Sequence, residues 1–407
     1  MSMYALNRVL AALVAPVLAL WVAGCSGGSS EGEGGSNEPE PIVIGAIFDL
    51  TGATSDVGVT YAEGMKDHIS WRNANGGIEG RPITLRSADY GYRVDNAERL
   101  YTQYVADGAV VFFGWGTGDT EALRGRIARD KVPFMSASYS TGLLDMEQAP
   151  YNFLVGTSYT DQALISLRWA KQDHEAKEGA EGPTKVAIVH HDSPFGTSPL
   201  EEARAYAEKH GIELTSIAMP KGATDFVAEL ARIQQAGADY VIIHNTAGPA
   251  SVMVKDARTQ GLDLTFIGLV WVADEIFLRL TGEAAEGVVG AMPFAIPTAD
   301  LPGAKNAAAY LEKKGESLQE KGLHYTQGWW TVGVMLEGVE RALKTGEPLT
   351  GESVKKALET LDDYETGGIT APITFSGESH RGNDSLRMHR VQGGAWVAIG
   401  DLMSAGG

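Results

Sequence analysis

The chain has 407 residues, of which 44% are apolar and 21% are charged, so it is long enough for two ordinary domains with a large core. This composition excludes a disordered chain and a collagen-like chain. The formal net charge of −19 at pH 7 also disfavours nucleic acid as a partner, because nucleic acid is itself a polyanion.

The N-terminal segment is typical of a signal peptide. It carries one basic residue, Arg8, followed by fifteen apolar residues from Val9 to Ala23, which is short for a stable membrane span. The segment ends in "VAGC", which resembles the lipobox of bacterial lipoproteins, and Cys25 is the only cysteine in the sequence. We therefore expect a signal peptide over residues 1–24 and a lipid on Cys25. The protein is expected to be exported and lipid-anchored to a bacterial membrane, facing the periplasm or the cell exterior.

Residues 26–41 read "SGGSSEGEGGSNEPEP" and contain only Ser, Gly, Glu, Asn and Pro. Such a composition cannot form a core. The lipidated Cys25 and this stretch are therefore expected to form a flexible linker over residues 25–41.

From residue 42 the chain alternates apolar runs with amphipathic stretches, and the pattern restarts after Tyr151. The expected strands are 42–48, 83–89, 110–114, 132–136, 185–191, 239–245 and 264–270. The expected helices are 58–77, 94–108, 119–131, 198–211, 224–238 and 248–261. Apolar strands that alternate with helices predict parallel sheets covered by helices on both faces, and the restart predicts two such α/β domains.

Five loops follow the expected strands and are rich in Gly, Ser or aromatic residues: "FFGWGTGDT", "MSASYST", "HHDSPFG", "HNTAGP" and "GLVWVAD". Ligands of open α/β sheets bind outside the carboxyl ends of the strands. We therefore expect the binding site in a cleft between the two domains, lined by these loops.

The first of these loops raises the possibility of a nucleotide site. The dinucleotide pattern G-x-G-x-x-G would need Gly where Asp119 stands, and no G-K-[ST] occurs in the sequence. The glycines are better suited to letting the backbone approach a small solute.

The sequence offers little support for catalysis. His190, His191 and Asp192 are consecutive, but adjacent residues at a strand end face opposite ways, and no paired Cys/His spacing of a metal site is present. From residue 42 onward, no hydrolase-type serine turn follows an apolar strand. We therefore expect a protein that is not an enzyme and has no catalytic residues, no metal and no cofactor.

Several of these segments resemble the type I periplasmic binding proteins of ABC importers, in the branch that binds branched-chain amino acids and amides. The similar segments include "TGATSDVGVTYAEGMKDHISWRNANGGIEG", "VPFMSASYSTGLL", "KVAIVHHDSPFG" and "GADYVIIHN", and the resemblance extends from about residue 42 to 400. It implies two doubly wound, Rossmann-like lobes joined by a three-strand hinge. The implied lobe boundaries are 42–157 plus 294–384 for lobe 1 and 158–293 plus 385–407 for lobe 2.

In amino-acid-binding members of that family, hydroxyls and a backbone amide of lobe 1 hold the ligand carboxylate. The matching positions here are Thr117, Ser138 and Ser140. The residues themselves agree, because hydroxyl donors and helix N-termini favour an anionic or strongly dipolar oxygen. The alternative is that Thr117 and Asp119 only cap a helix.

The amine end of the family's site is altered. Val270 stands where relatives place an acidic residue, Phe195 replaces a usual tyrosine, and a second tyrosine position falls at Thr246 or Ala247. Burying an ammonium group without a carboxylate is costly. The sequence therefore predicts a carboxylate or amide without an α-amine.

Aromatic residues are added on the same loops: Trp115, Tyr139, Phe195 and Trp271. Any one of them alone could serve packing, but four together favour a flat, apolar or aromatic ligand body. A branched-chain amino acid remains an alternative if Asp274, Glu275 or Asp192 supplies the missing charge.

The expected function is that of a lipid-anchored substrate-binding protein that clamps a small solute between two lobes. Its expected partners are the solute, which is a carboxylate, an amide or an amino acid, and the permease of an ABC transporter. We expect a monomer. The alternative function is a ligand sensor of the same fold that reports to a signalling partner.

Overall fold

The computed structural model describes residues 39–179, 181–298 and 300–406. The expected signal peptide, Cys25 and the linker as far as residue 38 lie outside the described residues and stay predictions. From residue 39 onward the chain forms one compact unit that contains two β-sheets. None of the described helices combines the length and the apolar character that a membrane crossing requires.

The first sheet has five strands in the order β2-β1-β3-β4-β5, and every neighbouring pair is parallel. Its strands are β1 (Ile42–Phe48), β2 (Ile83–Asp89), β3 (Val111–Gly114), β4 (Phe134–Ser136) and β5 (Asn152–Phe153). Because the strands are parallel and adjacent, their carboxyl ends meet at one edge of the sheet.

The second sheet has seven strands in the order β12-β11-β10-β9-β8-β6-β7. Its strands are β6 (Lys185–His191), β7 (Glu213–Met219), β8 (Tyr240–His244), β9 (Thr265–Gly268), β10 (Val289–Met292), β11 (Ser385–Gln392) and β12 (Ala395–Ser404). Strands β6 to β10 pair in parallel, whereas β11 is antiparallel to both β10 and β12. The expectation of mostly parallel α/β sheets is confirmed.

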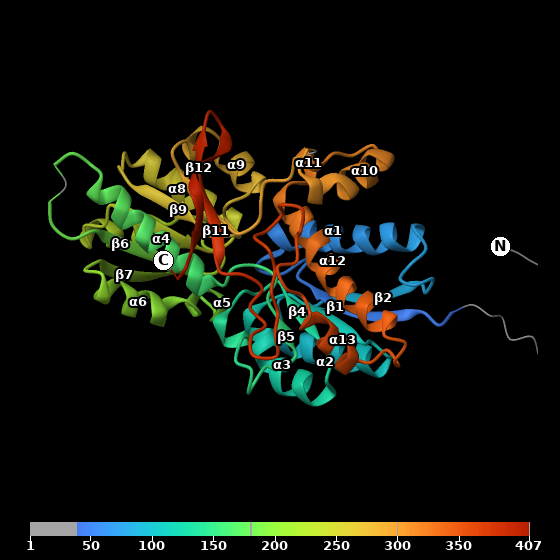
Figure 1. Cartoon of the computed structure of the whole chain (residues 1–407). Coiled ribbons are helices and arrows are strands. Elements are labelled where there is room, and N and C mark those ends of the chain that lie inside the picture. Colours follow the sequence, from blue (N-terminus) through green and yellow to red (C-terminus); the bar gives the residue numbers. More distant parts are fainter. Residues whose placement is uncertain (1–38, 180, 299, 407) are drawn as a thin grey trace, which may run out of the picture. The chain divides into compact units, whose positions relative to one another are not determined.

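Helices cover both sheets (Figure 1). The α-helices that begin before residue 195 are α1 (Ser55–Ala74), α2 (Val94–Ala106), α3 (Thr117–Asp130), α4 (Tyr159–Glu175) and α5 (Pro194–Thr197). The later ones are α6 (Leu200–Lys209), α7 (Val227–Gln235), α8 (Ala247–Thr259), α9 (Glu275–Thr281), α10 (Lys305–Lys314), α11 (Leu318–Lys321), α12 (Leu323–Lys344) and α13 (Gly351–Leu358). Three short 3₁₀ helices are η1 (Thr141–Leu143), η2 (Gly282–Ala285) and η3 (Pro302–Ala304).

The strands of the second sheet are buried on both faces, which explains why they are apolar throughout. Along β6, Val186 and Ile188 belong to the core cluster that includes residues of α4 and α6. The alternate residues Ala187 and Val189 belong to the other cluster, which includes residues of α8. Successive side chains of a strand point to opposite faces, so helices must cover both.

The seven strands expected from the sequence are all present, and β1, β2 and β6 have the expected bounds. The chain passes between the regions of the two sheets after β5, after β10 and before β11. The lobe boundaries that the resemblance implies lie at these passages and remain predictions.

Helix α1 is positioned by a close crossing with α12. A Cβ atom added to Gly64 of α1 would lie 1.9 Å from the Tyr325 carbonyl oxygen, and one added to Gly328 of α12 would lie 2.1 Å from the Tyr61 carbonyl oxygen. Glycine at both positions therefore lets the two backbones touch. This crossing fixes the N-terminal part of α1.

We expect Gly64→Ala to lower the free energy of unfolding by about 1–3 kcal/mol, because the added methyl group forces the two backbones apart. Urea denaturation of the full chain measures this change. Gly125→Ala in α3 is the matched control, because nothing lies within 4 Å of the position that its Cβ would occupy. That substitution should instead stabilise the protein by about 0.5–1 kcal/mol. Equal effects of the two substitutions would contradict the close crossing.

Candidate functional site

A small cavity lies where the carboxyl ends of the two sheets face each other. Its lining comes from segments that follow β1, β2, β3, β4 and β5 of the first sheet and β6, β8 and β9 of the second. The lining residues are Thr54, Val57, Tyr92, Trp115, Gly116, Thr117, Ala137, Tyr159, Phe195, Thr246 and Trp271. This is the place at which open α/β sheets bind their ligands.

The cavity is narrow. Its volume is about 20 Å³, which is room for about one water molecule. The cavity therefore suits a small ligand, and a larger one requires the walls to move apart.

The glycine-rich segment contributes three consecutive lining residues, Trp115 to Thr117, between the end of β3 and the start of α3. Behind this segment, the buried Asp119 carboxylate accepts hydrogen bonds from the Gly116 amide at 3.2 Å and the Tyr90 hydroxyl at 2.8 Å. Burial raises the pKa of Asp119 to about 7, although both hydrogen bonds favour its ionised form. Asp119 thus holds the loop in place, and Thr117 faces the cavity.

The serine positions expected to hold the ligand lie one layer behind the wall. The Thr117 and Ser138 hydroxyl oxygens are 2.6 Å apart, and the Ser140 amide donates to the Ser138 hydroxyl at 3.4 Å. The residues Ser138, Tyr139 and Ser140 are buried, but they do not line the cavity. The only residue of their loop that lines it is Ala137. Their direct contact with a ligand stays a prediction.

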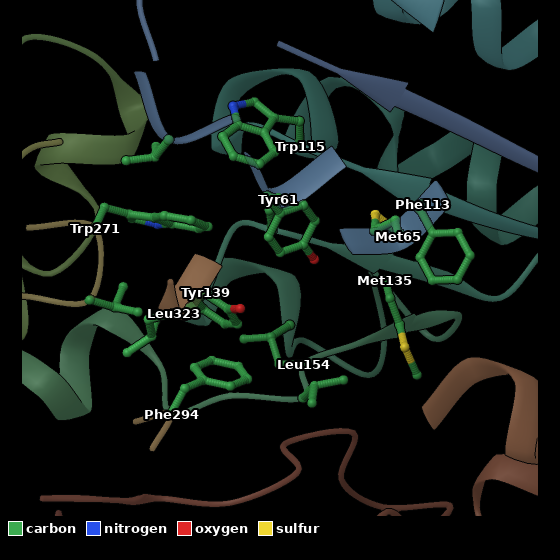
Figure 2. Close-up of a cluster of buried hydrophobic side chains, with 14 of the residues drawn as sticks. Tyr61, Met65, Phe113, Trp115, Met135, Tyr139, Leu154, Trp271, Phe294 and Leu323 are labelled. Atoms are coloured by element: carbon green, nitrogen blue, oxygen red, sulfur yellow. The ribbon is translucent and has the colours of Figure 1, made fainter. Parts of the chain in front are cut away.

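The aromatic side chains expected at the site come from loops of both sheets, and Figure 2 shows Trp115, Trp271, Tyr139 and Tyr61 in one cluster of buried side chains. The Trp115 and Trp271 ring centroids are 5.3 Å apart, and Tyr61 meets Trp115 edge-on at 5.3 Å. The Trp115 indole donates to the Thr54 hydroxyl at 2.8 Å, and the Trp271 indole donates to the Tyr159 hydroxyl at 2.8 Å. These bonds fix both tryptophan rings.

Of the remaining residues expected at the site, two line the cavity and one is buried outside its lining. Phe195 and Thr246 line the cavity, and the buried Thr246 hydroxyl lies beside the Asp56 carboxylate without a well-aligned hydrogen bond among the described residues. Val270 is buried outside the lining, and its amide donates to the Gln162 side chain at 3.1 Å. Thr246 is therefore a wall residue whose hydroxyl can still bond a ligand.

Sequence reasoning did not single out several wall residues, which include Tyr92 after β2 and Tyr159 at the start of α4. Both directly follow strands of the first sheet, so the rule that ligands bind beyond strand ends could have found them. The helix α4 was itself not assigned from the sequence. For that reason Tyr159 did not stand out.

Three acidic residues were considered as partners for a ligand ammonium, and none of them lines the cavity. Asp274 accepts from the Phe277 amide at 2.6 Å and lies 2.9 Å from His324 Nε2. Glu275 accepts from the Leu323 amide at 2.7 Å, and Asp192 is exposed. Each carboxylate is thus engaged elsewhere or points to solvent.

Buried polar contacts connect the two sides of the site. His324 of α12 and Asp274, which precedes α9, are each 1% exposed, and the Trp271 ring lies 4.9 Å from the His324 ring. Burial alone would lower the pKa of His324, but the Asp274 carboxylate and the Gln327 side chain raise it above its ordinary value. The contact with Asp274 therefore favours the protonated form of His324.

A second connection joins α1 to α8. The Gly248 amide donates to Asp56 Oδ2 at 2.8 Å, while Asp56 Oδ1 is buried and has no partner within the described part of the chain. Burial raises the pKa of Asp56, and the Gly248 bond opposes that change. Both connections hold the walls of the cavity together.

The consecutive histidines after β6 make local contacts. His190 Nδ1 lies 3.1 Å from the His191 carbonyl oxygen, and His191 Nδ1 lies 2.7 Å from the Ser193 hydroxyl. Burial lowers the pKa of His191 to about 4. In residues 39–179, 181–298 and 300–406, no group of three or more His, Cys, Asp or Glu side chains is placed to hold a metal ion.

Residues 41–395 match the family described as periplasmic binding protein. Among curated proteins, the chain is 25% identical over 344 residues to Leu/Ile/Val-binding protein homolog 3 of Brucella melitensis, covering 81% of this chain and 89% of that protein.

Two solved structures are also similar. One is a branched-chain amino acid ABC transporter from Thermus thermophilus with bound valine, at a TM-score of 0.84 and 27% identity, covering 90% of this chain and 97% of that one. The other is an ABC transporter substrate-binding protein from Aeropyrum pernix, at a TM-score of 0.81 and 28% identity, covering 90% and 96%.

Proposed function

The chain belongs to the periplasmic binding protein family, and we propose that it is the solute-binding component of an ABC importer of the branched-chain amino acid/amide type. The observation that carries this proposal is the cavity, whose walls come from the carboxyl ends of strands in both sheets. In such an arrangement a small solute touches both lobes at once. Closure of the lobes then presents the loaded form to a permease.

The solute is proposed to be a small carboxylate or amide with an apolar body. Thr117 and Thr246 offer hydroxyls from opposite sides of the cavity, and Trp115, Phe195 and Trp271 offer apolar surface. Four further proposed site residues, Ser138, Tyr139, Ser140 and Val270, stand behind the wall and come into reach as the lobes open or shift.

The family implies an extracytoplasmic location, and the lipid anchor at Cys25 is part of the proposal. The proposed function also includes delivery of the solute to an ABC permease by a monomeric protein. A sensor of the same fold would differ in its partner, so uptake of the solute by cells that lack this protein distinguishes the two. Loss of uptake supports delivery, and intact uptake with altered signalling supports sensing.

A branched-chain amino acid binder is the second candidate function. It is favoured by the similarity to the Thermus thermophilus protein, which was solved with bound valine. Weighing against it, the described cavity wall has no carboxylate for an α-ammonium group.

We expect Thr117→Ala combined with Ser140→Ala to lower solute affinity by about 10-fold to 100-fold, because hydrogen bonds to charged groups contribute about 1.5–3 kcal/mol. Isothermal titration calorimetry measures this loss. Ser166→Ala is the matched control, since Ser166 is a buried residue of α4 whose hydroxyl donates to the Gln162 carbonyl oxygen, and neither residue lines the cavity. Unchanged affinity in the double variant would refute the anchoring role of these hydroxyls.

The solute class can be found with a thermal-shift panel of amino acids, deaminated carboxylates, amides, urea and aromatic acids. A compound at about 100 times its dissociation constant should add roughly 2.7 kcal/mol to the free energy of unfolding. Stabilisation by leucine but not by its deaminated analogue would favour the amino acid binder. If no solute of any class stabilises the protein, the proposed function is wrong.

A further inference from the structure

We propose that the solute carries a compact methylated ammonium group, which the aromatic wall encloses, and a carbonyl or carboxylate oxygen that faces Thr117 and Thr246. This inference rests on the proposed function, in which the cavity holds the solute. It narrows the solute class to small methylated-ammonium zwitterions and their close relatives. Four features of the cavity lead to it.

The first feature is the inclination of the aromatic rings. The Trp115 and Trp271 planes meet at 51°, and the Tyr159 and Phe195 planes meet at 59° with centroids 5.3 Å apart. Tyr61 stands edge-on behind both tryptophans, at 73° and 63°. Parallel rings leave a slot for a flat ligand body, whereas inclined rings form corners. A rounded group fits a corner better than a flat body does.

The second feature is that the hydroxyls beside the two tryptophan rings already make hydrogen bonds. A primary ammonium group carries three N–H donors, and leaving them unpaired inside the protein is costly. The Thr54 hydroxyl already accepts from the Trp115 indole and donates to Asp49, and the Tyr159 hydroxyl accepts from the Trp271 indole. A fully methylated ammonium group has no N–H donor and is instead attracted to the faces of tryptophan and tyrosine.

The third feature is the charge around the wall. Three carboxylates lie directly behind lining residues: Asp49 bonds the Thr54 hydroxyl at 2.7 Å, Asp119 bonds the Gly116 amide, and Asp56 bonds the Gly248 amide near Thr246. Within the described chain none of the three is in an ion pair, and no lining residue is charged. Burial raises the pKa of Asp119 to about 7 and also raises the pKa of Asp56, so the negative charge of these groups grows as the pH rises. Such surroundings favour a ligand with a positive group over a purely anionic one, and the preference strengthens with pH.

The fourth feature is the oxygen end. The Thr246 hydroxyl lines the cavity, its residue is 2% exposed, and the Asp56 carboxylate lies beside it without a well-aligned hydrogen bond. A ligand oxygen that accepts from this hydroxyl gives it a better-aligned partner. Thr117 offers a second hydroxyl across the cavity. A zwitterion can place its positive group against the aromatic rings and its carboxylate against the two threonine hydroxyls at the same time.

The test compares matched ligands on the full chain by isothermal titration calorimetry. Trimethylglycine, proline betaine and carnitine represent methylated-ammonium carboxylates, and 3,3-dimethylbutanoate has the shape of trimethylglycine without its positive charge. Valine and glycine represent primary ammonium compounds. We expect at least one methylated compound to bind, and to bind at least tenfold more tightly than the shape analogue that lacks the ammonium charge and than the primary amines.

The variant Trp115→Leu keeps an apolar side chain but removes one aromatic face. Because Trp115 is buried, the substitution should lower the melting temperature without ligand. It should also weaken binding of the methylated compound about tenfold or more, while leaving the weak binding of 3,3-dimethylbutanoate similar. Equal binding of the methylated-ammonium compound and of its analogue without the ammonium charge overturns the inference, as does tighter binding of valine. In both cases the proposed function stands, because a solute still binds. Failure of every compound in this set and in the broader thermal-shift panel would instead refute the proposed function.

Discussion

Replacing Trp271 with alanine is expected to weaken solute binding by at least 100-fold and to lower the free energy of unfolding by about 3–5 kcal/mol. Trp271 is 4% exposed and lines the cavity, and its ring contacts Trp115, Tyr139 and His324. Its loss removes the contact surface between the walls and leaves the Tyr159 hydroxyl without its indole donor. The losses of stability and of affinity have the same origin, because the same ring packs against the cavity walls and contacts the ligand.

Calorimetric titration and chemical denaturation measure the two effects separately. Trp169→Ala is the matched control, because Trp169 is a half-buried tryptophan of α4 that packs under Arg390 and is outside the cavity lining. It should reduce stability less and leave affinity unchanged. If Trp271→Ala binds the solute as tightly as the parent does, the cavity is not the binding site.

Replacing His324 with glutamine is expected to lower the free energy of unfolding by about 3–5 kcal/mol near pH 6, because it leaves the buried Asp274 carboxylate without its charged partner. The pKa of His324 is raised in the folded protein, so its contribution is fully present below about pH 6.5. The contribution is lost as the pH rises through the folded-state pKa. The groups that face His324 are Asp274, Gln327 and Glu275, and its charge also acts on Asp56.

Urea denaturation of the parent and of His324→Gln at several pH values between 6 and 9 measures this dependence. The stability difference between the two proteins should shrink as the pH rises. Asp274→Asn combined with His324→Gln is the control, since it removes the charge of both partners and should cost less than the sum of the single substitutions. A stability difference that does not change with pH would contradict a protonated His324 in the folded protein.

Most of the strand framework could be predicted from the sequence, because strands buried on both faces are continuous apolar runs. The run "IVIGAIF" became β1 and "KVAIVHH" became β6 with the expected bounds. The elements that sequence reasoning left unassigned have mixed patterns, among them α4 and α12, whose buried residues include Gln162, His324 and Gln327. Because polar residues are buried in these two helices, their apolar residues alone do not show the spacing of a helix.

The hairpin of β11 and β12 carried a signal that could have been used. Gly393 and Gly394 separate the two strands and both have positive φ angles, 60° and 78°. Two glycines between apolar-rich strands are a typical hairpin turn.

The candidate site was predictable in part. Trp115, Thr117, Phe195, Thr246 and Trp271 follow strand ends and line the cavity. The pairing of Asp274 with His324, 50 positions along the chain, depends on the packing of α12 against the second sheet's loops and has no local sequence signal. The inclination of the aromatic rings depends on the same long-range packing.

The most direct test of the account is a crystal structure of the full chain with the solute that stabilises it most in the thermal-shift panel. We predict the solute between the two sheets, in contact with Trp115 and Trp271 and within hydrogen-bond distance of Thr117 or Thr246. A solute bound outside this cavity, for example in the open groove lined by Lys305, Glu312 and Trp396, would contradict the account.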